Sequence, residues 1–563
     1  MKKILFVFIL LFTVLLLGSC DAENQTCKPH KLLPAVRENE ITPTCGMDGG
    51  YDSVLYCATC KEELSRTRKI IPKTNEHTPL SAIKENQILP TCEKSGSHDE
   101  VVYCSVCYEE LDKLTVTDAK IPHNVENGKC VNCNRKEDGG FTFSYYLNKT
   151  AKLISIGDCT DTEIIIPEET DNGFKIVYIG EAAFKDCKNI TSVIIPDSVT
   201  LIDDEAFKGC AGLKEIVLPK ELVAIGKEAF MDCTALTSIN IPSSVDNIRD
   251  YAFFNCRSLE SVVFGQSSKL KLINDSTFRG CESLRDITIP EGVEKMHDCA
   301  FMECRSLSKV HLPDSIEWID SFAFADCISL YSITLPKDVR IADAAFPGCC
   351  KLVEVINNSS EDITVGFGVA ASAIEVHTGK SKIVNKDGYI FYTAGGVNYL
   401  VGYAGDDTEL TLPKDYNGEG YEIYKYAFYE NDNVTKIIIP DSVSKIDEYA
   451  FSYCDSLVSV TIGNGVTHIG EGAFHDCYSL ASITIPNSVK SIGYSVFSRC
   501  KSLTSVTIGK NVESIATYVF YDCGSLTNIK YRGTEKQWNA ISKTSYWDYN
   551  TGSYTITYNY TGE

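Results

Sequence analysis

The chain of 563 residues is poor in positive charge and in membrane-spanning sequence. It has 53 Lys and Arg against 76 Asp and Glu, a net charge of −23, so nucleic acid and anionic membrane surfaces are poor partners. No run beyond residue 17 is apolar enough to cross a membrane. The 25 cysteines fall short of the roughly 8–10% of a short disulfide scaffold. The sequence also lacks His-Glu-x2-His, phosphate-loop and Gly-x-Ser-x-Gly motifs, so we expect no enzyme activity.

The first 20 residues have the features of an export signal. Two lysines precede an apolar run over 4–17, which is shorter than the roughly 20 residues of a spanning helix. The run ends in Leu17-Gly18-Ser19-Cys20, which resembles a bacterial lipobox. The resemblance implies that 1–19 is a signal peptide, that Cys20 carries covalent lipid, and that 20–26 is a linker. The alternative is a plain secretory signal with an incidental cysteine.

Residues 27–138 contain a Cys/His repeat with a period near 47. The spacing His-x14-Cys-x11-Cys-x2-Cys occurs twice, and a shortened third copy follows. Three sulfurs and one imidazole have the composition of a closed, structural zinc site, so we expect small zinc-ribbon-like repeats. The predicted zinc ligands are His30, Cys45, Cys57 and Cys60, then His77, Cys92, Cys104 and Cys107, then His123, Cys130 and Cys133.

Disulfides are the competing interpretation of these cysteines, because an exported protein meets an oxidising environment. Each full copy has an odd number of cysteines, and a recurring histidine has no role in a disulfide framework. These two features favour zinc, and a mixed or redox use is the third possibility. Either Cys27 completes the three-ligand last copy, or that site is vestigial.

A second repeat, with a period of 23, occupies residues 175–355 and 425–531. Its skeleton is Leu-x2-Val/Ile-x-Ile-Pro/Gly-x2-Val-x2-Ile-Gly-x2-Ala-Phe-x2-Cys. Such a period with short Leu/Ile strands predicts a leucine-rich-repeat solenoid, whose coils bury their apolar faces by stacking. The repeat phenylalanines are Phe184, Phe207, Phe230, Phe253, Phe278, Phe301, Phe324, Phe346, Phe428, Phe451, Phe474, Phe497 and Phe520.

This skeleton resembles that of the BspA-like leucine-rich-repeat family. The resemblance implies a β-rich solenoid, with its first block at 139–355 and its second block at 425–531. Residues 356–424 break the register but keep strand-like runs, so we expect irregular coils that continue the stack. We expect 532–563 to cap the last coil, since an uncovered coil exposes apolar surface.

A second set of cysteines follows the repeat phenylalanine by three positions. We expect buried thiols that fill a tight turn, because free cysteine behaves as a small hydrophobic residue. Asn431 takes this place in one coil, and Cys159, Cys299 and Cys350 lie outside the ladder and are the candidates for reactivity. The ladder consists of Cys187, Cys210, Cys233, Cys256, Cys281, Cys304, Cys327, Cys349, Cys454, Cys477, Cys500 and Cys523.

No binding residues can be assigned from the sequence. Hydroxyl rows on the strands, such as Thr461, Thr484 and Thr507, are explained by the repeat consensus and would otherwise form a broad protein-binding face. The 30 tyrosines are concentrated towards the end of the chain. Aromatic residues favour interfaces, although core and cap packing accounts for many of them.

The family resemblance implies a lipid-anchored bacterial cell-surface protein with an adhesin-like function. Its partners would be protein or glycan ligands on host cells, matrix or neighbouring cells, and it would meet the membrane only through its lipid. One alternative is an exported enzyme accessory or substrate platform, which would need a catalytic constellation in 356–424 or in the cap. Another is a structural component of a surface coat.

Overall fold

The computed structural model describes most of the chain beyond residue 140 and a set of strands before it. The described residues are 35–41, 49–56, 63–71, 82–88, 96–103, 110–118, 125–126, 129–130, 141–156, 161–170 and 172–562. The chain forms two compact units, Met1–Gln87 with Ser97–Val116, and Ile88–Gly96 with Thr117–Glu563.

The 47-residue repeat forms two three-stranded sheets with the same strand order. Each strand of the second sheet begins 47 residues after its counterpart. The first sheet, which is antiparallel, contains β1 (Val36–Ile41), β2 (Gly49–Tyr56) and β3 (Glu63–Ile71). The second contains β4 (Ile83–Ile88), β5 (Gly96–Tyr103) and β6 (Glu110–Asp118). A short antiparallel pair follows, β7 (Val125–Glu126) and β8 (Lys129–Cys130).

An ion pair recurs at matching positions of these two sheets. Arg66 Nη1 lies 3.1 Å from Asp52 Oδ2, and Lys113 Nζ lies 2.8 Å from Asp99 Oδ2. Each residue of the second pair lies 47 positions after its counterpart in the first pair. The repeat therefore preserves a cross-strand contact as well as the strand positions.

In the larger unit, most coils contribute one short strand to each of two parallel sheet faces. One face of the first block contains β11 (Glu163–Ile165), β13 (Ser192–Ile194), β15 (Glu215–Val217), β17 (Ser238–Ile241), β19 (Ser261–Phe264), β21 (Asp286–Thr288), β23 (Lys309–His311), β25 (Ser332–Leu335), β27 (Glu354–Asn357) and β28 (Glu375–His377). The other contains β9 (Thr142–Tyr145), β10 (Thr150–Ser155), β12 (Lys175–Ile179), β14 (Leu201–Ile202), β16 (Ala224–Ile225), β18 (Asn247–Ile248), β20 (Leu272–Ile273), β22 (Lys295–Met296), β24 (Trp318–Ile319) and β26 (Arg340–Ile341).

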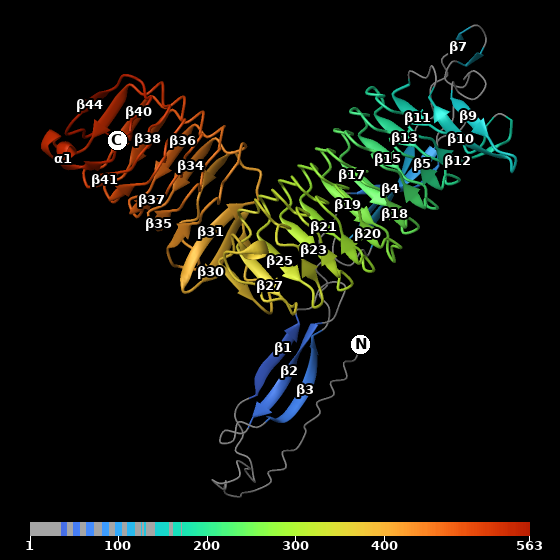
Figure 1. Ribbon diagram of the computed structural model, residues 1–563, viewed down its shortest axis with the longest axis horizontal. Helices are drawn as coiled ribbons and strands as arrows, with labels where there is room; N and C mark the ends of the chain where they lie inside the picture. Colours follow the sequence, from blue (N-terminus) through green and yellow to red (C-terminus); the bar gives the residue numbers. More distant parts are fainter. Residues whose placement is uncertain are drawn as a thin grey trace, which may run out of the picture. The chain divides into compact units, whose positions relative to one another are not determined.

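The second block repeats this arrangement, and Figure 1 shows the coils of each block stacked side by side. Its first face contains β32 (Glu409–Thr411), β34 (Lys436–Ile439), β36 (Ser459–Ile462), β38 (Ser482–Ile485), β40 (Ser505–Ile508), β42 (Asn528–Tyr531) and β44 (Thr555–Thr557). Its other face contains β29 (Val384–Lys386), β30 (Tyr389–Ala394), β31 (Val397–Tyr403), β33 (Tyr421–Ile423), β35 (Val443–Ile446), β37 (His468–Ile469), β39 (Ser491–Ile492), β41 (Ser514–Ile515) and β43 (Ser542–Lys543).

The repeat skeleton explains the shape of one coil. In β36 the alternation of exposed and buried residues places Val460 and Ile462 in the core. Gly463 follows, and a Cβ added there would lie 2.5 Å from the carbonyl carbon of Pro440 in the preceding coil. The Pro/Gly position therefore ends the strand at a place where neighbouring backbones are very close.

The repeat phenylalanines form two internal stacks, which confirms the predicted solenoid core. The Phe207 and Phe230 ring centroids lie 5.2 Å apart with an interplanar angle of 1°, and Phe451 and Phe474 lie 5.0 Å apart at 5°. These four side chains are completely buried. Burial of this kind supplies much of the stability of a coil, since the apolar area of each coil is covered by the coils stacked on it.

The segment 356–424, where we expect irregular coils, contains an antiparallel hairpin. Gly395 and Gly396, with φ of +58° and +82°, turn β30 back onto β31 in an antiparallel hairpin. Among the described residues, no strand pairing joins the sheets of the first block to those of the second. A small buried cluster around Tyr331 and Tyr392 separates two large cores, so the solenoid has two packed blocks.

The residues after 531 extend both sheets of the second block. β43 pairs with β41 and β44 pairs with β42. Between them lies helix α1 (Glu535–Ala540), whose Thr534 and Gln537 form a capping box and whose Trp538 is buried. A short 3-10 helix, η2 (Gly368–Ala370), lies in the irregular segment. In the described part of the chain, no helix has the length and apolar character needed to cross a membrane.

Candidate functional site: a tyrosine-lined groove

Most coils have a turn that carries the Ala-Phe-x2-Cys segment or a variant of it, and we call the outer surface of these turns the turn face. The residues two before and two after the repeat phenylalanine have positive φ in most coils. In the coil of Phe451, for example, they are Tyr449 with φ +53° and Tyr453 with φ +59°. Side chains at these positions line the turn face, which differs sharply between the two blocks.

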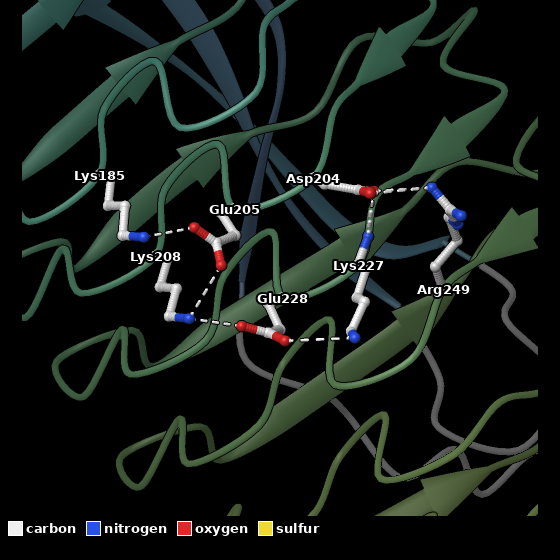
Figure 2. Close-up of polar contacts among 7 residues, drawn as sticks. All are labelled: Lys185, Asp204, Glu205, Lys208, Lys227, Glu228 and Arg249. Atoms are coloured by element: carbon white, nitrogen blue, oxygen red, sulfur yellow. Dashed lines mark hydrogen bonds and ion pairs between the residues drawn. The ribbon is translucent and has the colours of Figure 1, made fainter.

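In the first block the turn face carries a ladder of ion pairs (Figure 2). Lys208 Nζ lies 3.1 Å from Glu205 Oε1 in its own coil and 2.5 Å from Glu228 Oε2 in the next. Lys185 of the preceding coil also pairs with Glu205. Hydrogen bonds from Lys185 and Lys208 lower the pKa of the Glu205 carboxyl. The ladder thus connects three successive coils.

A second branch of the ladder lies beside the first. Arg249 Nη1 lies 2.8 Å from Asp204 Oδ1, and the backbone N–H of Lys227 donates to the same oxygen at 2.7 Å. Lys227 Nζ lies 3.7 Å from Glu228 Oε1 and so links the branches (Figure 2). Opposite charges alternate along the coils and pair with one another, so this face serves stability and solubility.

In the second block tyrosines occupy the corresponding positions. Tyr426 stacks on Tyr449 with ring centroids 5.5 Å apart, and Tyr453 meets His475 edge-on at 5.7 Å. A second aromatic group begins two coils further on. It consists of Tyr494, Tyr518, Tyr521, Tyr546 and Tyr549, linked by ring contacts of 5.5–6.1 Å.

Several of these tyrosines occupy a backbone conformation that opposes a side chain. Tyr426, Tyr449, Tyr518 and Tyr546 have φ between +53° and +63°, and the equivalent residue of one coil is Gly472. The left-handed region costs a residue with a Cβ roughly 1–2 kcal/mol relative to the ordinary helical region. The fold accepts glycine at this place, so the backbone does not require the tyrosines.

Between the two aromatic groups lies a groove of about 500 Å³. It opens where small residues, Gly472 and Ser495, replace tyrosine in the turn-face row. The ring of Tyr449 lies over Gly472, where an added Cβ would come within 2.4 Å of Tyr449 Cε1. The groove is lined by Tyr449, His475, Tyr494, Ser495, Ser498, Arg499, Tyr518, Tyr521 and Tyr549.

A buried carboxylate positions the charged residues of the groove. The Asp476 side chain is fully buried, and its Oδ1 lies 3.1 Å from Arg499 Nε while its Oδ2 lies 3.0 Å from His475 Nε2. Arg499 Nη2 also donates to the Tyr478 hydroxyl at 3.3 Å. Burial lowers the pKa of the His475 imidazole, while the neighbouring Asp476 carboxyl acts in the opposite direction. The positive charge of Arg499 is therefore balanced by Asp476.

The residues predicted as zinc ligands and lipidation site fall almost entirely outside the described residues. This holds for Cys20, His30, Cys45, Cys57, Cys60, His77, Cys92, Cys104, Cys107, His123 and Cys133. Only the backbone of Cys130 is described, in β8, where it pairs with Val125. In the part of the chain that the structure covers, no cluster of three or more His, Cys, Asp or Glu residues has metal-binding geometry.

The cysteine ladder is buried as predicted, with one exception. Cys187 is half-exposed because it begins the ladder and has no repeat phenylalanine one coil earlier. Outside the ladder, burial raises the pKa of Cys350 to about 11 and also raises that of Cys299, so neither thiol is activated. Cys159 lies outside the described residues.

The hydroxyl rows and the groove illustrate different limits of the sequence analysis. Ser459, Ser482 and Ser505 are in register on neighbouring strands, as the repeat predicts, without forming part of the groove. The groove residues were missed because His475 and Arg499 have no motif spacing. The available signal was the row two residues before each repeat phenylalanine, which reads Tyr426, Tyr449, Gly472, Ser495 and Tyr518 in the second block.

Comparison with known proteins identifies the repeat family. The model described as "BspA type Leucine rich repeat region" matches residues 158–270, 266–366 and 421–548, more than half of the chain. No curated protein matches.

Several solved structures resemble the chain. A leucine rich cell surface protein from Faecalibacterium prausnitzii A2-165 is 29% identical over 72% of this chain and 97% of its own, with a TM-score of 0.32. A leucine-rich repeat protein from Bacteroides ovatus is 22% identical over 74% of this chain and 98% of its own, also at 0.32. The T. pallidum leucine rich repeat protein is 30% identical over 34% of this chain and 88% of its own, again at 0.32. On the family match, this chain belongs to the BspA-type leucine-rich-repeat family.

Proposed function

We propose that this protein is an exported, lipid-anchored bacterial surface protein that binds macromolecules of host cells, matrix or neighbouring cells. The anchor is Cys20, and the Cys/His repeats of 27–138 form a structural, zinc-stabilised segment before the solenoid. Binding takes place on the turn face of the second block, at the tyrosine-lined groove. The lipobox-like signal and the cell-surface relative from Faecalibacterium support the location.

The observation that carries the proposal is the group of exposed tyrosines in and beside the groove. Tyr494, Tyr546 and Tyr549 are 43%, 60% and 54% exposed, an unusual density of open aromatic surface. Tyrosine is among the residues that dominate binding energy at interfaces. The same positive φ recurs two residues before most repeat phenylalanines in both blocks, so the exposure of these rings, and not their backbone conformation, points to a role in binding.

The test separates binding from folding by replacing a tyrosine with glycine. Tyr518→Gly removes a groove ring while relieving a backbone whose φ is +58°. The matched control is Tyr251→Gly in the first block, because Tyr251 also lies two residues before a repeat phenylalanine and also has φ +58°. Bacteria that display the full chain would be tested for attachment to epithelial cells and to matrix-coated surfaces.

We expect Tyr518→Gly to reduce attachment at least about tenfold and Tyr251→Gly to leave it unchanged. The unfolding temperatures of both variants should remain within a few degrees of that of the parent, since glycine adopts this backbone conformation without steric cost. Equal attachment by the parent and Tyr518→Gly, or an equal loss in both variants, would refute the groove as the binding site.

A further inference from the structure

We propose that the groove of the second block is a carbohydrate subsite that holds a pyranose ring of a neutral glycan against its tyrosines. This inference rests on the proposed function, because it names the ligand class of the same site. The chemistry of the lining, the arrangement of its rings and the local charge each support it.

The composition of the lining distinguishes a sugar from an apolar peptide side chain. Tyrosine, serine, histidine and arginine account for all nine lining residues, and none of them is aliphatic. Pockets that anchor apolar protein side chains are lined mainly by hydrophobic residues. A lining in which each side chain has a polar atom matches a ligand that is covered with hydroxyl groups.

The tyrosine rings supply flat surfaces against which the C–H side of a sugar ring can lie. In the order of the coils, Tyr449 comes before the small residues Gly472 and Ser495, and Tyr518 comes after them. The π-face of an aromatic ring is electronegative and attracts the weakly positive C–H groups that cover one side of a pyranose. The volume of about 500 Å³ is within the usual size of small-ligand sites.

The polar residues supply fixed hydrogen-bonding groups. Asp476 Oδ1 lies 3.1 Å from Arg499 Nε in an ion pair that lacks hydrogen-bond geometry, and the Tyr478 hydroxyl accepts from Arg499 Nη2, so the guanidinium is held beside the groove before a ligand arrives. His475 Nδ1 is buried and has no hydrogen-bond partner within the described residues. Because this nitrogen has no accessible surface, a ligand hydroxyl reaches it only if the imidazole turns, whereas Arg499 is open to a ligand without rearrangement.

The charge of the site favours a neutral glycan over a sulfated or sialylated one. Arg499 is paired with the buried carboxylate of Asp476, so the groove has no uncompensated positive charge. The whole chain has a net charge of −23, which repels anionic ligands at long range.

The experiment measures binding of named oligosaccharides to the full chain by saturation-transfer NMR and calorimetry. The probes are neutral tetrasaccharides of glucose, galactose, mannose and N-acetylglucosamine, with heparin tetrasaccharide as the anionic comparison. The variants are Tyr518→Gly, Tyr518→Phe and Arg499→Gln, with Tyr251→Gly as the matched control.

We expect at least one neutral tetrasaccharide to bind, about tenfold or more weakly to Tyr518→Gly and to Arg499→Gln. Tyr518→Phe, which keeps the ring face, should stay within about threefold of the parent, and Tyr251→Gly should be unchanged. Binding of none of the neutral probes, a preference for heparin, or equal binding by Tyr518→Gly would overturn the inference. If one of these outcomes occurs but the Tyr518→Gly variant still loses attachment, the carbohydrate inference fails and the proposed function stands. If a sugar binds but the Tyr518→Gly variant attaches as well as the parent, the proposed function fails.

Discussion

The thiol of Cys477 donates a hydrogen bond of 3.1 Å to the backbone carbonyl oxygen of Phe451, one coil earlier. The same bond joins Cys210 to Phe184 and Cys523 to Phe497, with S···O distances of 3.0 and 2.9 Å. Each ladder cysteine with a repeat phenylalanine 25–28 residues before it makes this contact. The cysteine therefore both fills the turn and satisfies a carbonyl group of the neighbouring coil.

Replacing a ladder cysteine by alanine should destabilise the second block. Cys477→Ala removes a buried donor and leaves a small cavity, which together cost about 1–3 kcal/mol. Cys187→Ala is the matched control, because Cys187 is half-exposed and its thiol lies 3.7 Å from Lys185 O in its own coil. Urea denaturation should show a clear loss for the first variant and less than about 0.5 kcal/mol for the second. Equal losses would refute the role of the carbonyl contact.

The ladder also predicts a loss of stability in alkali. Burial raises the pKa of Cys210 and of Cys523 to about 12, from an ordinary value of 9.0. Below pH 9 the thiols are protonated in both states, and their contribution to stability is complete. As the pH rises from 9 towards 12, only the unfolded chain loses these protons, so the free energy of unfolding falls. Urea midpoints that do not change between pH 8 and pH 11 would contradict this prediction.

The sequence predicted the solenoid well because its repeat encodes the core directly. Phe207 and Phe451 occupy equivalent positions in the cores of their blocks. One repeat skeleton therefore specifies many equivalent core positions. The sequence located the break in the repeat at 356–424, but it could not predict the small buried cluster that contains Tyr331 and Tyr392, because its contacts have no counterpart in the repeat. Asn431 illustrates the same limit. It begins a new stack, and its Oδ1 accepts from the backbone of Asn433 and Val434 instead of continuing the thiol ladder.

The groove was harder to predict because it arises from departures from the repeat. Gly472 makes room for the ring of Tyr449, and Asp476 pairs with Arg499, which belongs to the next coil. Neither relationship is visible as a motif, because the partners are separated by about one period of 23 residues. Aligning the coils on their phenylalanines would have placed these residues side by side.

Cys20→Ala should release the protein from membranes. The lipobox-like Leu17-Gly18-Ser19-Cys20 places the acylated residue at the start of the mature chain, and stable anchoring requires more than one acyl chain. Fractionation of cells without detergent should recover the variant in the soluble fraction, with Cys27→Ala as a membrane-bound control. A variant that stays with the membrane after cleavage before residue 20 would contradict the anchor.

Chelation should unfold the Cys/His repeats and spare the solenoid. We expect about two zinc ions per chain, one for each complete set of three cysteines and one histidine. Because metal binding supplies much of the folding energy of so small a segment, a chelator should abolish its protection from hydrogen exchange. Cys45→Ser should lose one zinc ion. Mass spectrometry that finds linked cysteines, together with metal analysis that finds no zinc, would exclude this model of the segment.

Phe474→Ala should loosen the second block before the first. Its ring is fully buried and lies 5.0 Å from Phe451 and 5.6 Å from Phe497, so truncation leaves a cavity that costs about 3–5 kcal/mol. The apolar cores of the two blocks are separate, and within each block a coil packs on its neighbours, although Arg285–Asp406 and Arg305–Glu430 ion pairs join the blocks at the surface. Hydrogen exchange should therefore accelerate near residues 451–500 while residues 207–256 keep their protection.

The reciprocal variant makes this prediction sharper. Phe230→Ala removes an equally buried ring from the first block, where Phe207 and Phe253 both lie 5.2 Å away. It should loosen residues 207–256 and leave the groove intact, so attachment through the second block should survive in Phe230→Ala and fail in Phe474→Ala. Uniform loss of protection in both variants would mean that the blocks unfold as one cooperative unit, because damage would then pass across the Tyr331–Tyr392 cluster as readily as between adjacent coils.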